Sequence, residues 1–507
     1  MMFKRFSKVG LGAVLLASSS MGSKFLGVLR DYIFAKVFGA GAELDAYFAA
    51  FRVPDFLYML LIFGAMSAAF IPIYTSLLHK EQGDEQASVF ASQVLNGLLL
   101  LLILASGLAF LFAPQLVPLL VPGFEGEMLD LTVDLTRIML LSPIFLGLSS
   151  VFQGVENSHK KFLGIALAPI VYNLSIIAAA WFFGASHGVS ALAWGVVAGA
   201  VLHFLVQVPG ALRTNFRYSF DFSFRSKAFG EFVRLTIPRL FGISATQIGL
   251  FVNTVIASLL AVGSLSVFNY AFNLQSLPYA VVAVSFSVAV FSTLSEQAAA
   301  KDKTDFLQTM RRSIHSILFW VLPAVCGLFL LRQEVVDLIL TGGAFDESAA
   351  AMTALTLGIF VWAAIFQSFT PLFARAFYSL HETKRPVYVA FLVVIVNTSL
   401  ALIFTQIYGF EVWSLALALL CGSLVEAVLL IVLLGRFMKV SALGFFDFLL
   451  LGKVLLGTFV MFIFVFGLQQ ISFPNLFLEL LIVSGAGGAV YLGLAKLLKT
   501  IPVLRGS

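Results

Sequence analysis

Residues 95–113 read LNGLLLLLILASGLAFLFA, a stretch without a single charged side chain. About 20 residues of this kind form a helix long enough to cross the ~30 Å hydrocarbon core of a bilayer. Similar stretches recur along all 507 residues, of which 60% are hydrophobic and 11% charged. Soluble chains carry roughly a quarter charged residues. The composition therefore excludes a soluble enzyme, a disordered chain and a secreted disulfide scaffold, and it predicts an all-α polytopic membrane protein.

Fourteen apolar segments are long enough to be predicted as transmembrane helices. They cover residues 6–37, 44–78, 86–113, 127–155, 162–184, 189–212, 229–258, 263–296, 306–331, 347–380, 386–407, 411–435, 445–470 and 475–498. The first follows basic residues, as a signal peptide would, but the apolar character continues past Gly27, which favours a retained helix. The longest segments are expected to tilt or bend.

Basic residues gather in alternate loops of this predicted topology. With the N-terminus in the cytoplasm, the inner loops and termini hold twenty-one Lys and Arg residues, and the outer loops hold one clear case, Arg332. Cytoplasmic loops of membrane proteins carry an excess of Lys and Arg. Both termini are therefore predicted to be cytoplasmic, which an even number of spans allows.

The two halves of the chain repeat at an offset of 224 residues. Lys160 and Lys161 recur as Lys384 and Arg385, and Asn173 recurs as Asn397. A repeat unit of six spans keeps the same orientation in both copies, so we expect two parallel six-helix lobes around a central cavity. The predicted domains are an N-terminal lobe at 1–212, a cytoplasmic inter-lobe linker at 213–228, a C-terminal lobe at 229–440, and two extra helices at 441–507.

Charged residues inside the predicted spans concentrate in the first two spans. They are Lys24, Arg30, Asp31, Lys36, Asp45, Arg52 and Asp55. The matching region of the second half, 246–279, has no charged residue and offers Asn253, Asn269 and Asn273 instead. Charges within a membrane are costly and mark functional sites. A net-positive wall opposite a neutral one suits an anionic amphiphile, because guanidinium and ammonium groups bind phosphate oxygens.

Two interpretations of the cations on the first span remain open. Lys24 and Arg30 lie six residues apart, about 120° around an unbroken helix. A bend at Gly22 or Gly27 would bring them together as a ligand-facing pair. Alternatively, Arg30 pairs locally with Asp31, and Lys36 extends to the outer interface.

Other residues give little support for catalysis or metal binding. The six histidines show no metal-ligand spacing, and Cys326 and Cys421 lie in apolar runs typical of core cysteines. No nucleotide-binding or metalloprotease motif is present, so no cofactor and no nucleic-acid partner are predicted. Gly195 and Gly199 form a GxxxG pair, which predicts close helix packing.

Several motifs resemble those of one transporter family. They are SKFLGVLRD at 23–31, FGAG at 38–41, LDAYFAAFRVP at 44–54, AAFIP at 68–72, VPGF at 121–124, LAP at 167–169 with Asn173, GVSALAWG at 188–195, QVP at 207–209, IPR at 237–239, and RAFY at 375–378 followed by Thr383, Lys384 and Pro386. Across essentially the whole chain, this set is similar to the MurJ/MviN family of lipid II flippases within the multidrug/oligosaccharidyl-lipid/polysaccharide exporter superfamily.

The resemblance implies a fold, a substrate and a binding site. The fold would be fourteen helices, with the last two forming a groove for a lipid tail. The activity would be transfer of lipid II, a polyprenyl-pyrophosphate-linked peptidoglycan precursor, from the cytoplasmic to the outer leaflet of the bacterial inner membrane. Lys24 and Arg30 would face the pyrophosphate, and Asp45 matches the family's acidic position. The predicted substrate-binding residues are Lys24, Arg30, Asp31, Asp45, Arg52 and Asn273, with a coupling ion or the membrane potential as the energy source.

The sequence also departs from the family pattern. Tyr58, Met59 and Asn273 stand where many members carry arginine, and Phe63 stands where many carry an acidic residue. The alternative is therefore a flippase for another lipid-linked oligosaccharide. A drug exporter of the superfamily would lack the segment 445–498. A membrane enzyme would need a catalytic outer loop, and a structural scaffold of the cell-wall machinery has no feature in its favour.

Overall fold

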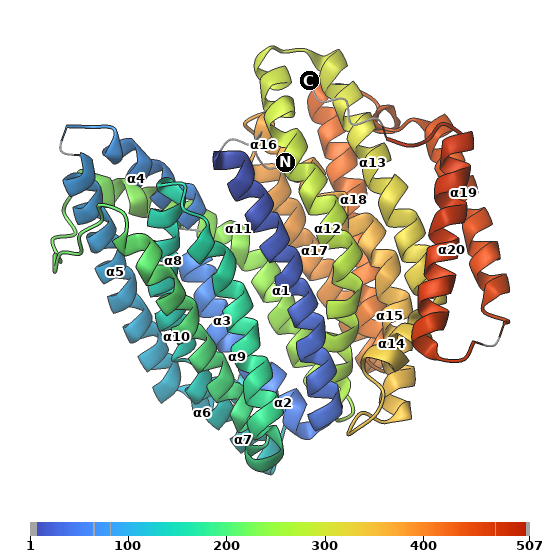
Figure 1. The fold of residues 1–507 in the computed structure, drawn as a ribbon, viewed down its shortest axis with the longest axis horizontal. Coiled ribbons are helices and arrows are strands. Elements are labelled where there is room, and N and C mark those ends of the chain that lie inside the picture. Colours follow the sequence, from blue (N-terminus) through green and yellow to red (C-terminus); the bar gives the residue numbers. More distant parts are fainter. Residues whose placement is uncertain (1–7, 64–65, 82, 472, 503–507) are drawn as a thin grey trace. The chain divides into compact units, whose positions relative to one another are not determined.

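The computed structural model describes residues 8–63, 66–81, 83–471 and 473–502. These residues form helices joined by short connections, and no β-strand occurs among them (Figure 1). The all-α class predicted from composition is confirmed. Contacts divide the chain into two compact units: unit 1 holds the residues up to Ser266 with Gly343–Phe345, and unit 2 holds Val267–Gly342 and Asp346 onward. The lobe boundaries inferred from the repeat stay a prediction.

Unit 1 contains eleven α-helices and two π-helical turns among its described residues. They are α1 (Lys8–Phe38), α2 (Ala42–Ala50), α3 (Arg52–Tyr58), η2 (Met59–Phe63), η3 (Met66–Phe70), α4 (Ile71–Leu78), α5 (Gly83–Leu111), α6 (Ala113–Leu120), α7 (Gly126–Met139), α8 (Ser142–Ser158), α9 (Leu163–His187), α10 (Ser190–Leu212) and α11 (Lys227–Ser258). The second predicted span is thus interrupted by π-helical turns, which are frequent at functional sites.

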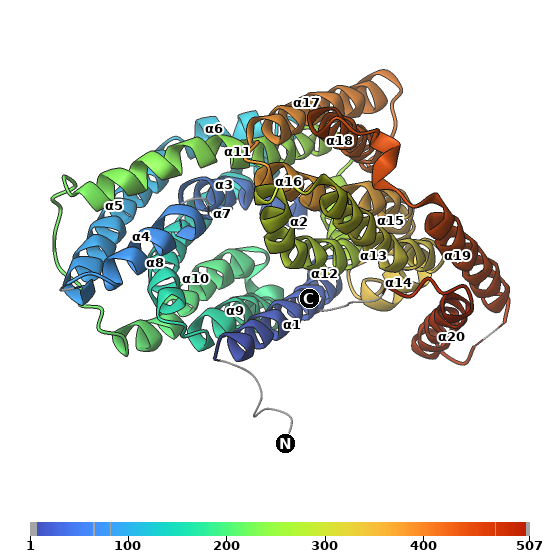
Figure 2. The same ribbon diagram turned by 90° about the horizontal axis from the view of Figure 1, so that it is seen from above.

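Unit 2 is formed by the later helices. They are α12 (Ser264–Ala299), whose first turn belongs to unit 1, α13 (Lys303–Leu330), α14 (Arg332–Ile339), α15 (Glu347–Gln367), α16 (Thr370–Ser379), α17 (Lys384–Leu402), the π-helical η4 (Ile403–Ile407), α18 (Trp413–Met438), the 3₁₀-helical η5 (Ala442–Phe445), α19 (Phe448–Leu468) and α20 (Leu476–Leu497). Helices α19 and α20 lie side by side and pack on α13 (Figure 2).

Ten helices in the described part of the chain are long and apolar enough to cross a membrane. They establish a multi-pass membrane protein. The other four predicted spans also coincide with helices. Span 6–37 matches α1, span 44–78 matches α2 to α4, span 229–258 matches α11, and span 263–296 matches α12. The total of fourteen spans stays a prediction.

Glycines allow the closest helix contact in unit 1. Helix α10 packs along α9, and Ser175 on α9 donates a hydrogen bond to the carbonyl oxygen of Gly195 (3.0 Å). A β-carbon at Gly199 would lie 3.0 Å from the carbonyl oxygen of Tyr172, so only glycine lets the two backbones approach this far. The packing role predicted for the GxxxG pair is confirmed.

An aromatic cluster joins α11 to the rest of unit 1. Phe70 stacks on Tyr74 and on Phe90, and Phe90 meets the ring edge of Phe232 on α11 (6.2 Å between centroids). Phe216, from the segment before α11, is buried in the same cluster. This burial explains why α11 folds with the first unit, although the repeat places its span in the second half.

A buried glutamate forms a second contact that depends on glycine. Glu156 on α8 is fully buried, and neither carboxylate oxygen accepts a hydrogen bond of normal geometry from a described residue. The carboxylate lies at the N-terminus of α9, beside the backbone of Ile165 and 2.6 Å from where a β-carbon of Gly164 would be. A helix N-terminus favours a carboxylate. A β-carbon on Gly210 of α10 would overlap the same carboxylate.

Replacing Gly210 by alanine is expected to destabilise unit 1 by about 1–3 kcal/mol, the usual cost of overpacking a tight interior. Removing the glutamate side chain, in Gly210→Ala/Glu156→Ala, should restore most of that loss. The measurement is the thermal unfolding midpoint of the purified protein in detergent. Gly107→Ala is the matched control, because no atom lies within 4 Å of its β-carbon position. Equal midpoints for Gly210→Ala and the unsubstituted protein would contradict this account.

Candidate functional site

Arg30 and Asp31 form an ion pair on α1. Nη2 and Nε of Arg30 donate to Oδ1 of Asp31 at 3.0 and 3.2 Å, and the guanidinium lies 5.6 Å from the ring centroid of Phe34. Asp31 is buried, whereas the Arg30 side chain remains 24% exposed. The local ion pair, one of the two interpretations above, is confirmed. The Arg30 side chain is thus paired with a buried carboxylate and still partly exposed.

Helix α1 continues without a break through Gly22 and Gly27. The helix is therefore not unwound at these glycines, and the pairing of Lys24 with Arg30 at a ligand stays a prediction. Lys24 is half-buried and makes no ion pair with any described residue. The ammonium group of Lys36 lies 5.5 Å from the ring centroid of Tyr32.

Asp45 on α2 is held by the residues that begin α12. Its Oδ2 accepts a hydrogen bond from the backbone N–H of Gly263, and its Oδ1 accepts from the N–H of Ser266, both at 2.7 Å. The Ser266 hydroxyl also donates to Oδ1 (2.6 Å). The carboxylate is 1% exposed, so it serves as a buried cap for an entering helix. Its predicted contact with substrate stays a prediction.

Arg52 lies at the start of α3 and reaches a polar residue of α11. Its Nε donates to the hydroxyl of Thr254 (2.9 Å), and Thr254 donates in turn to the carbonyl oxygen of Leu250 (3.0 Å). Two residues 202 positions apart are thereby joined within unit 1. Sequence patterns gave no signal for Thr254, because it is one of three threonines on α11 and no motif sets it apart.

A cavity of about 200 Å³ with both apolar and polar lining residues lies beside α3 in unit 1. Its lining comes from four regions of the chain: Phe51, Pro54, Asp55 and Tyr58 at α3, Ser142 and Leu146 on α8, Pro169 and Tyr172 on α9, and His203 on α10. The Nδ1 atom of His203 lies 2.7 Å from the hydroxyl of Ser149, which fixes the imidazole. The cavity offers a carboxylate, two phenols and an imidazole, a set that can hydrogen-bond a polar headgroup.

Tyr172 and His203 had not been singled out as site residues. Each is one of a few polar residues in a mostly apolar span, a signal that could have drawn attention to them. Asn273 lies on α12 in unit 2, where its carbonyl oxygen accepts a hydrogen bond from Ser276 (2.8 Å). Of the predicted site residues, α1 to α3 thus carry Lys24, Arg30, Asp31, Asp45 and Arg52 within unit 1.

Unit 2 contains an apolar groove of about 490 Å³ between α13, α14, α19 and α20. Trp320 and Gly327 of α13 line it together with Met461 of α19 and Gly487 of α20. The hydroxyl of Tyr491 at the groove donates to the carbonyl oxygen of Phe319 (2.7 Å), which ties α20 to α13. Such a groove can hold a hydrocarbon chain and offers no chemistry for a polar ligand.

The fold is that of a known class of membrane transporters. An inward-facing structure of a multidrug resistance MATE family transporter of the MOP superfamily matches with a TM-score of 0.68 and 15% identity, over 82% of this chain and 94% of that one. A family model described as Lipid II flippase MurJ matches residues 34–485. The chain belongs to the MurJ family.

Individual relatives agree with this assignment. A lipid II flippase MurJ structure in an inward closed conformation has a TM-score of 0.81 and 27% identity, covering 96% of this chain and 98% of its own. A probable lipid II flippase MurJ of Thermotoga maritima is 31% identical over 75% of this chain and 76% of its own length. A relative of the same description from Buchnera aphidicola is 29% identical over 88% and 87%.

Proposed function

We propose that this protein is a transporter that moves lipid II from the cytoplasmic to the outer leaflet of the bacterial inner membrane for peptidoglycan synthesis. Membership of the MurJ family over most of the chain supports the substrate. The single observation that carries the mechanism is Arg30: a guanidinium on a membrane helix, held by Asp31 yet partly exposed. An arginine in hydrocarbon needs an anion, and a pyrophosphate supplies one.

In this proposal, each predicted binding residue has a different role. Arg30 contacts the pyrophosphate oxygens, and Lys24 adds a point charge one and two-thirds helical turns away. Asp31 orients Arg30, and Arg52 is oriented by its bond to Thr254. Asn273 takes the position of a neutral hydrogen-bonding partner in unit 2. Asp45 keeps the entry to α12 in place.

The lipid tail is assigned to the groove between α13, α14, α19 and α20. Its lining is almost wholly apolar, so a polyprenyl chain can stay there while the headgroup is solvated elsewhere. Desolvating a pyrophosphate in hydrocarbon would cost many kcal/mol, and alternating access avoids that cost.

The distribution of charge supports a membrane orientation for the protein and an energy source for transport. The asymmetry of twenty-one basic residues against one supports cytoplasmic termini. Inward movement of a cation or the membrane potential itself would drive export, because the substrate headgroup is anionic.

A flippase for another lipid-linked oligosaccharide is the second candidate. Tyr58 and Asp55 both line the cavity beside α3. Tyr58 stands where many members carry arginine, so this cavity presents less positive charge than the family pattern implies. A sugar headgroup with fewer phosphates would suit it.

The two candidates are separated by depleting the protein from cells and measuring which leaflet holds lipid II. We expect lipid II to become inaccessible to a periplasmic hydrolase upon depletion, and accessible again once the unsubstituted gene is expressed. If lipid II stays accessible while another polyprenyl-linked glycan is retained inside, the second candidate is correct. If neither changes, the transporter proposal fails.

A further inference from the structure

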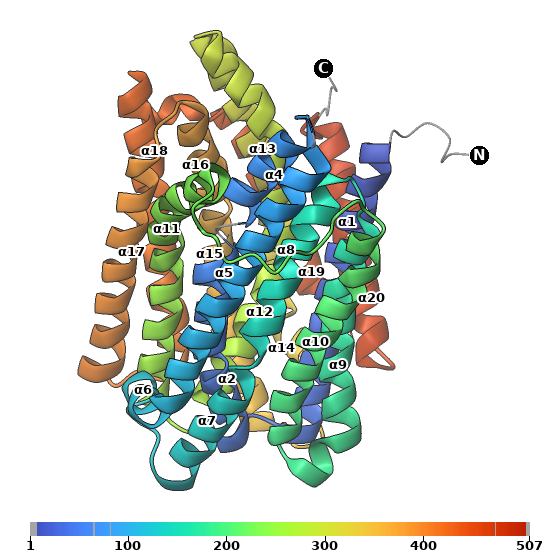
Figure 3. The ribbon, with the colours of Figure 1, turned by 90° about the vertical axis from the view of Figure 1, so that its left-hand side faces the viewer.

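The segment between α10 and α11 has a strict two-residue pattern. Tyr218, Phe220, Phe222 and Phe224 alternate with Ser219, Asp221 and Ser223. Its backbone is non-helical, and Figure 3 shows the segment running alongside α5. The aromatic residues at the two ends of this run contact α5: the Tyr218 hydroxyl donates to Oδ1 of Asn96 (2.9 Å), and the Phe224 ring lies beside Gly97. Between them, we call Ser219, Asp221 and Ser223 the polar face of the segment, and Phe220 and Phe222 with the Tyr218 ring its aromatic face.

The polar face is bound to α5. The hydroxyl of Ser92 accepts a hydrogen bond from the N–H of Ser219 (3.0 Å), and Nδ2 of Asn96 donates to the carbonyl oxygen of Asp221 (2.8 Å). Nε2 of Gln93 donates to Oδ2 of Asp221 (2.8 Å). These α5 side chains are all buried. The segment is thus a fixed element and not a solvated linker.

The hydrogen bonds also keep Asp221 charged. Donation from Ser223 and from Gln93 holds the pKa of the Asp221 carboxyl below its usual value. A lowered folded-state pKa means that this stabilisation is present above the unfolded pKa and is lost as the pH falls through the folded pKa. The docking should therefore persist at neutral pH.

The aromatic face is exposed. Tyr218 is 52%, Phe220 82% and Phe222 45% exposed, although Phe220 and Phe222 touch edge to face with centroids 4.9 Å apart. A contiguous exposed aromatic patch marks a membrane or partner contact. The length of helix α5 favours the membrane over a protein partner as the contact of this patch. Its 29 residues extend about 43 Å, longer than a ~30 Å core, and its uncharged apolar stretch begins at Leu95, so we expect Gln93 close to the membrane boundary.

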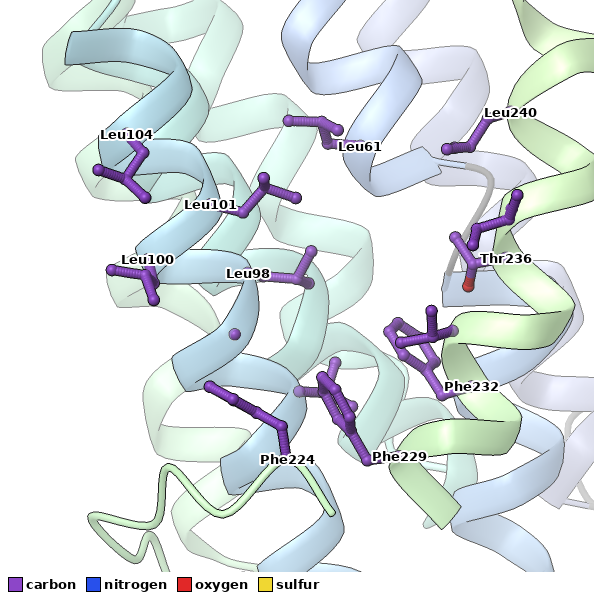
Figure 4. A pocket seen from close by; sticks show the side chains of 14 residues that line it. Leu61, Leu98, Leu100, Leu101, Leu104, Phe224, Phe229, Phe232, Thr236 and Leu240 are labelled. Atoms are coloured by element: carbon purple, nitrogen blue, oxygen red, sulfur yellow. The ribbon is translucent and has the colours of Figure 1, made fainter. Parts of the chain in front are cut away.

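Phe224 continues from this patch into an apolar groove of about 420 Å³. The groove lies between α5 and α11, with Leu98 and Leu104 on one side and Phe229 and Leu240 on the other (Figure 4). Its base depends on Gly97, because a β-carbon there would lie 3.3 Å from the ring of Phe224. A groove of this composition at membrane depth can accommodate a lipid chain.

Unpaired cations flank the aromatic residues. Arg217 and Arg225 bracket the aromatic run, and Lys227 opens α11; all three side chains are exposed. In the part of the chain that the structure describes, none of them forms an ion pair. Aromatic side chains at the boundary together with basic residues attract anionic lipid headgroups.

We propose that residues 217–227 and the groove between α5 and α11 form a binding site for one anionic phospholipid. An acyl chain fills the groove past Phe224, and the phosphate meets Arg217 and Arg225. Phe220 and Phe222 embed in the same leaflet, on the side of the basic loops. This site is separate from the groove in unit 2, and it does not depend on which lipid the protein transports.

The test is native mass spectrometry of the full-length protein with phosphatidylglycerol or with phosphatidylcholine of the same chains. We expect at least tenfold tighter binding of phosphatidylglycerol. Arg217→Gln/Arg225→Gln should lose most of that preference, about fivefold for each charge removed. Gly97→Leu should weaken both lipids by displacing Phe224. Lys301→Gln/Lys303→Gln, which removes two charges from the loop before α13, is the matched control and should bind as the unsubstituted protein does.

Two results would overturn the proposal. One is equal binding of the two lipids by the unsubstituted protein, which would mean ordinary annular contact. The other is an unchanged lipid preference in Arg217→Gln/Arg225→Gln, a surface substitution that leaves the core intact. The variant Phe220→Ser/Phe222→Ser tests the aromatic patch itself. If this variant changes the oligomeric mass but not lipid binding, the patch is a contact between copies of the chain.

Discussion

Replacing Arg30 by alanine is expected to lower lipid II transport about a hundredfold while the protein still folds and inserts. The loss of a charge-assisted pair to an anion costs roughly 2–5 kcal/mol, and every 1.4 kcal/mol is tenfold. The Arg30 side chain is 24% exposed and paired with Asp31, so its removal takes away the positive charge proposed to face the ligand. The measurement is flipping of lipid II in proteoliposomes, corrected for the amount of reconstituted protein.

Two further variants give this experiment its specificity. Arg30→Lys keeps the charge but loses the planar fork, and should show an intermediate rate. Arg137→Ala removes an arginine from α7, where its side chain makes long contacts with Asp134 (3.8 Å) and with the ring and carbonyl oxygen of Phe110, and it should transport within about twofold of the unsubstituted protein. Full activity of Arg30→Ala would remove Arg30 from the site.

Asp45→Ala is expected to destabilise the protein by about 3 kcal/mol or more. It removes a buried acceptor of three hydrogen bonds and leaves the N–H groups of Gly263 and Ser266 unpaired, each at a cost of about 1–3 kcal/mol. Thermal unfolding of the purified protein, followed by intrinsic fluorescence, measures the effect.

An exposed helix cap is the control for Asp45. Asp346 accepts a hydrogen bond from the N–H of Ala349 at the start of α15 (2.7 Å), and its replacement by alanine should cost only about 1 kcal/mol. A stable Asp45→Ala protein that nevertheless fails to transport would instead support the predicted substrate contact of Asp45.

Local sequence rules predicted those features that depend on neighbouring residues. Apolar length predicted the helices, the GxxxG spacing predicted the contact of Gly195 with α9, and adjacency predicted the pair of Arg30 and Asp31. The residues that complete the site come from far along the chain. Thr254 reaches Arg52 across 202 positions, and Gly263 reaches Asp45 across 218. No period or motif encodes such contacts, since they arise only after the helices have packed.

The cavity beside α3 was missed for a related reason. Tyr172 and His203 lie on different helices, and only packing of α9 and α10 brings them to Asp55. Helix α1 stays α-helical through Gly22 and Gly27, since glycine lowers helix stability by only about 1 kcal/mol, which packing against α9 offsets.

The docking of the segment between α10 and α11 limits where the protein can flex. A segment that joins two repeats is usually regarded as a flexible tether that allows the repeats to move. Here that tether is fastened to α5 by buried amides and hydroxyls, and α11 shares an aromatic core with α5. We therefore expect the chain to flex beyond this segment, towards the carboxyl-terminal end of α11 and the turn held by Asp45. Lengthening the tether with extra residues should leave the transport cycle unaffected, whereas stiffening that later turn should slow it.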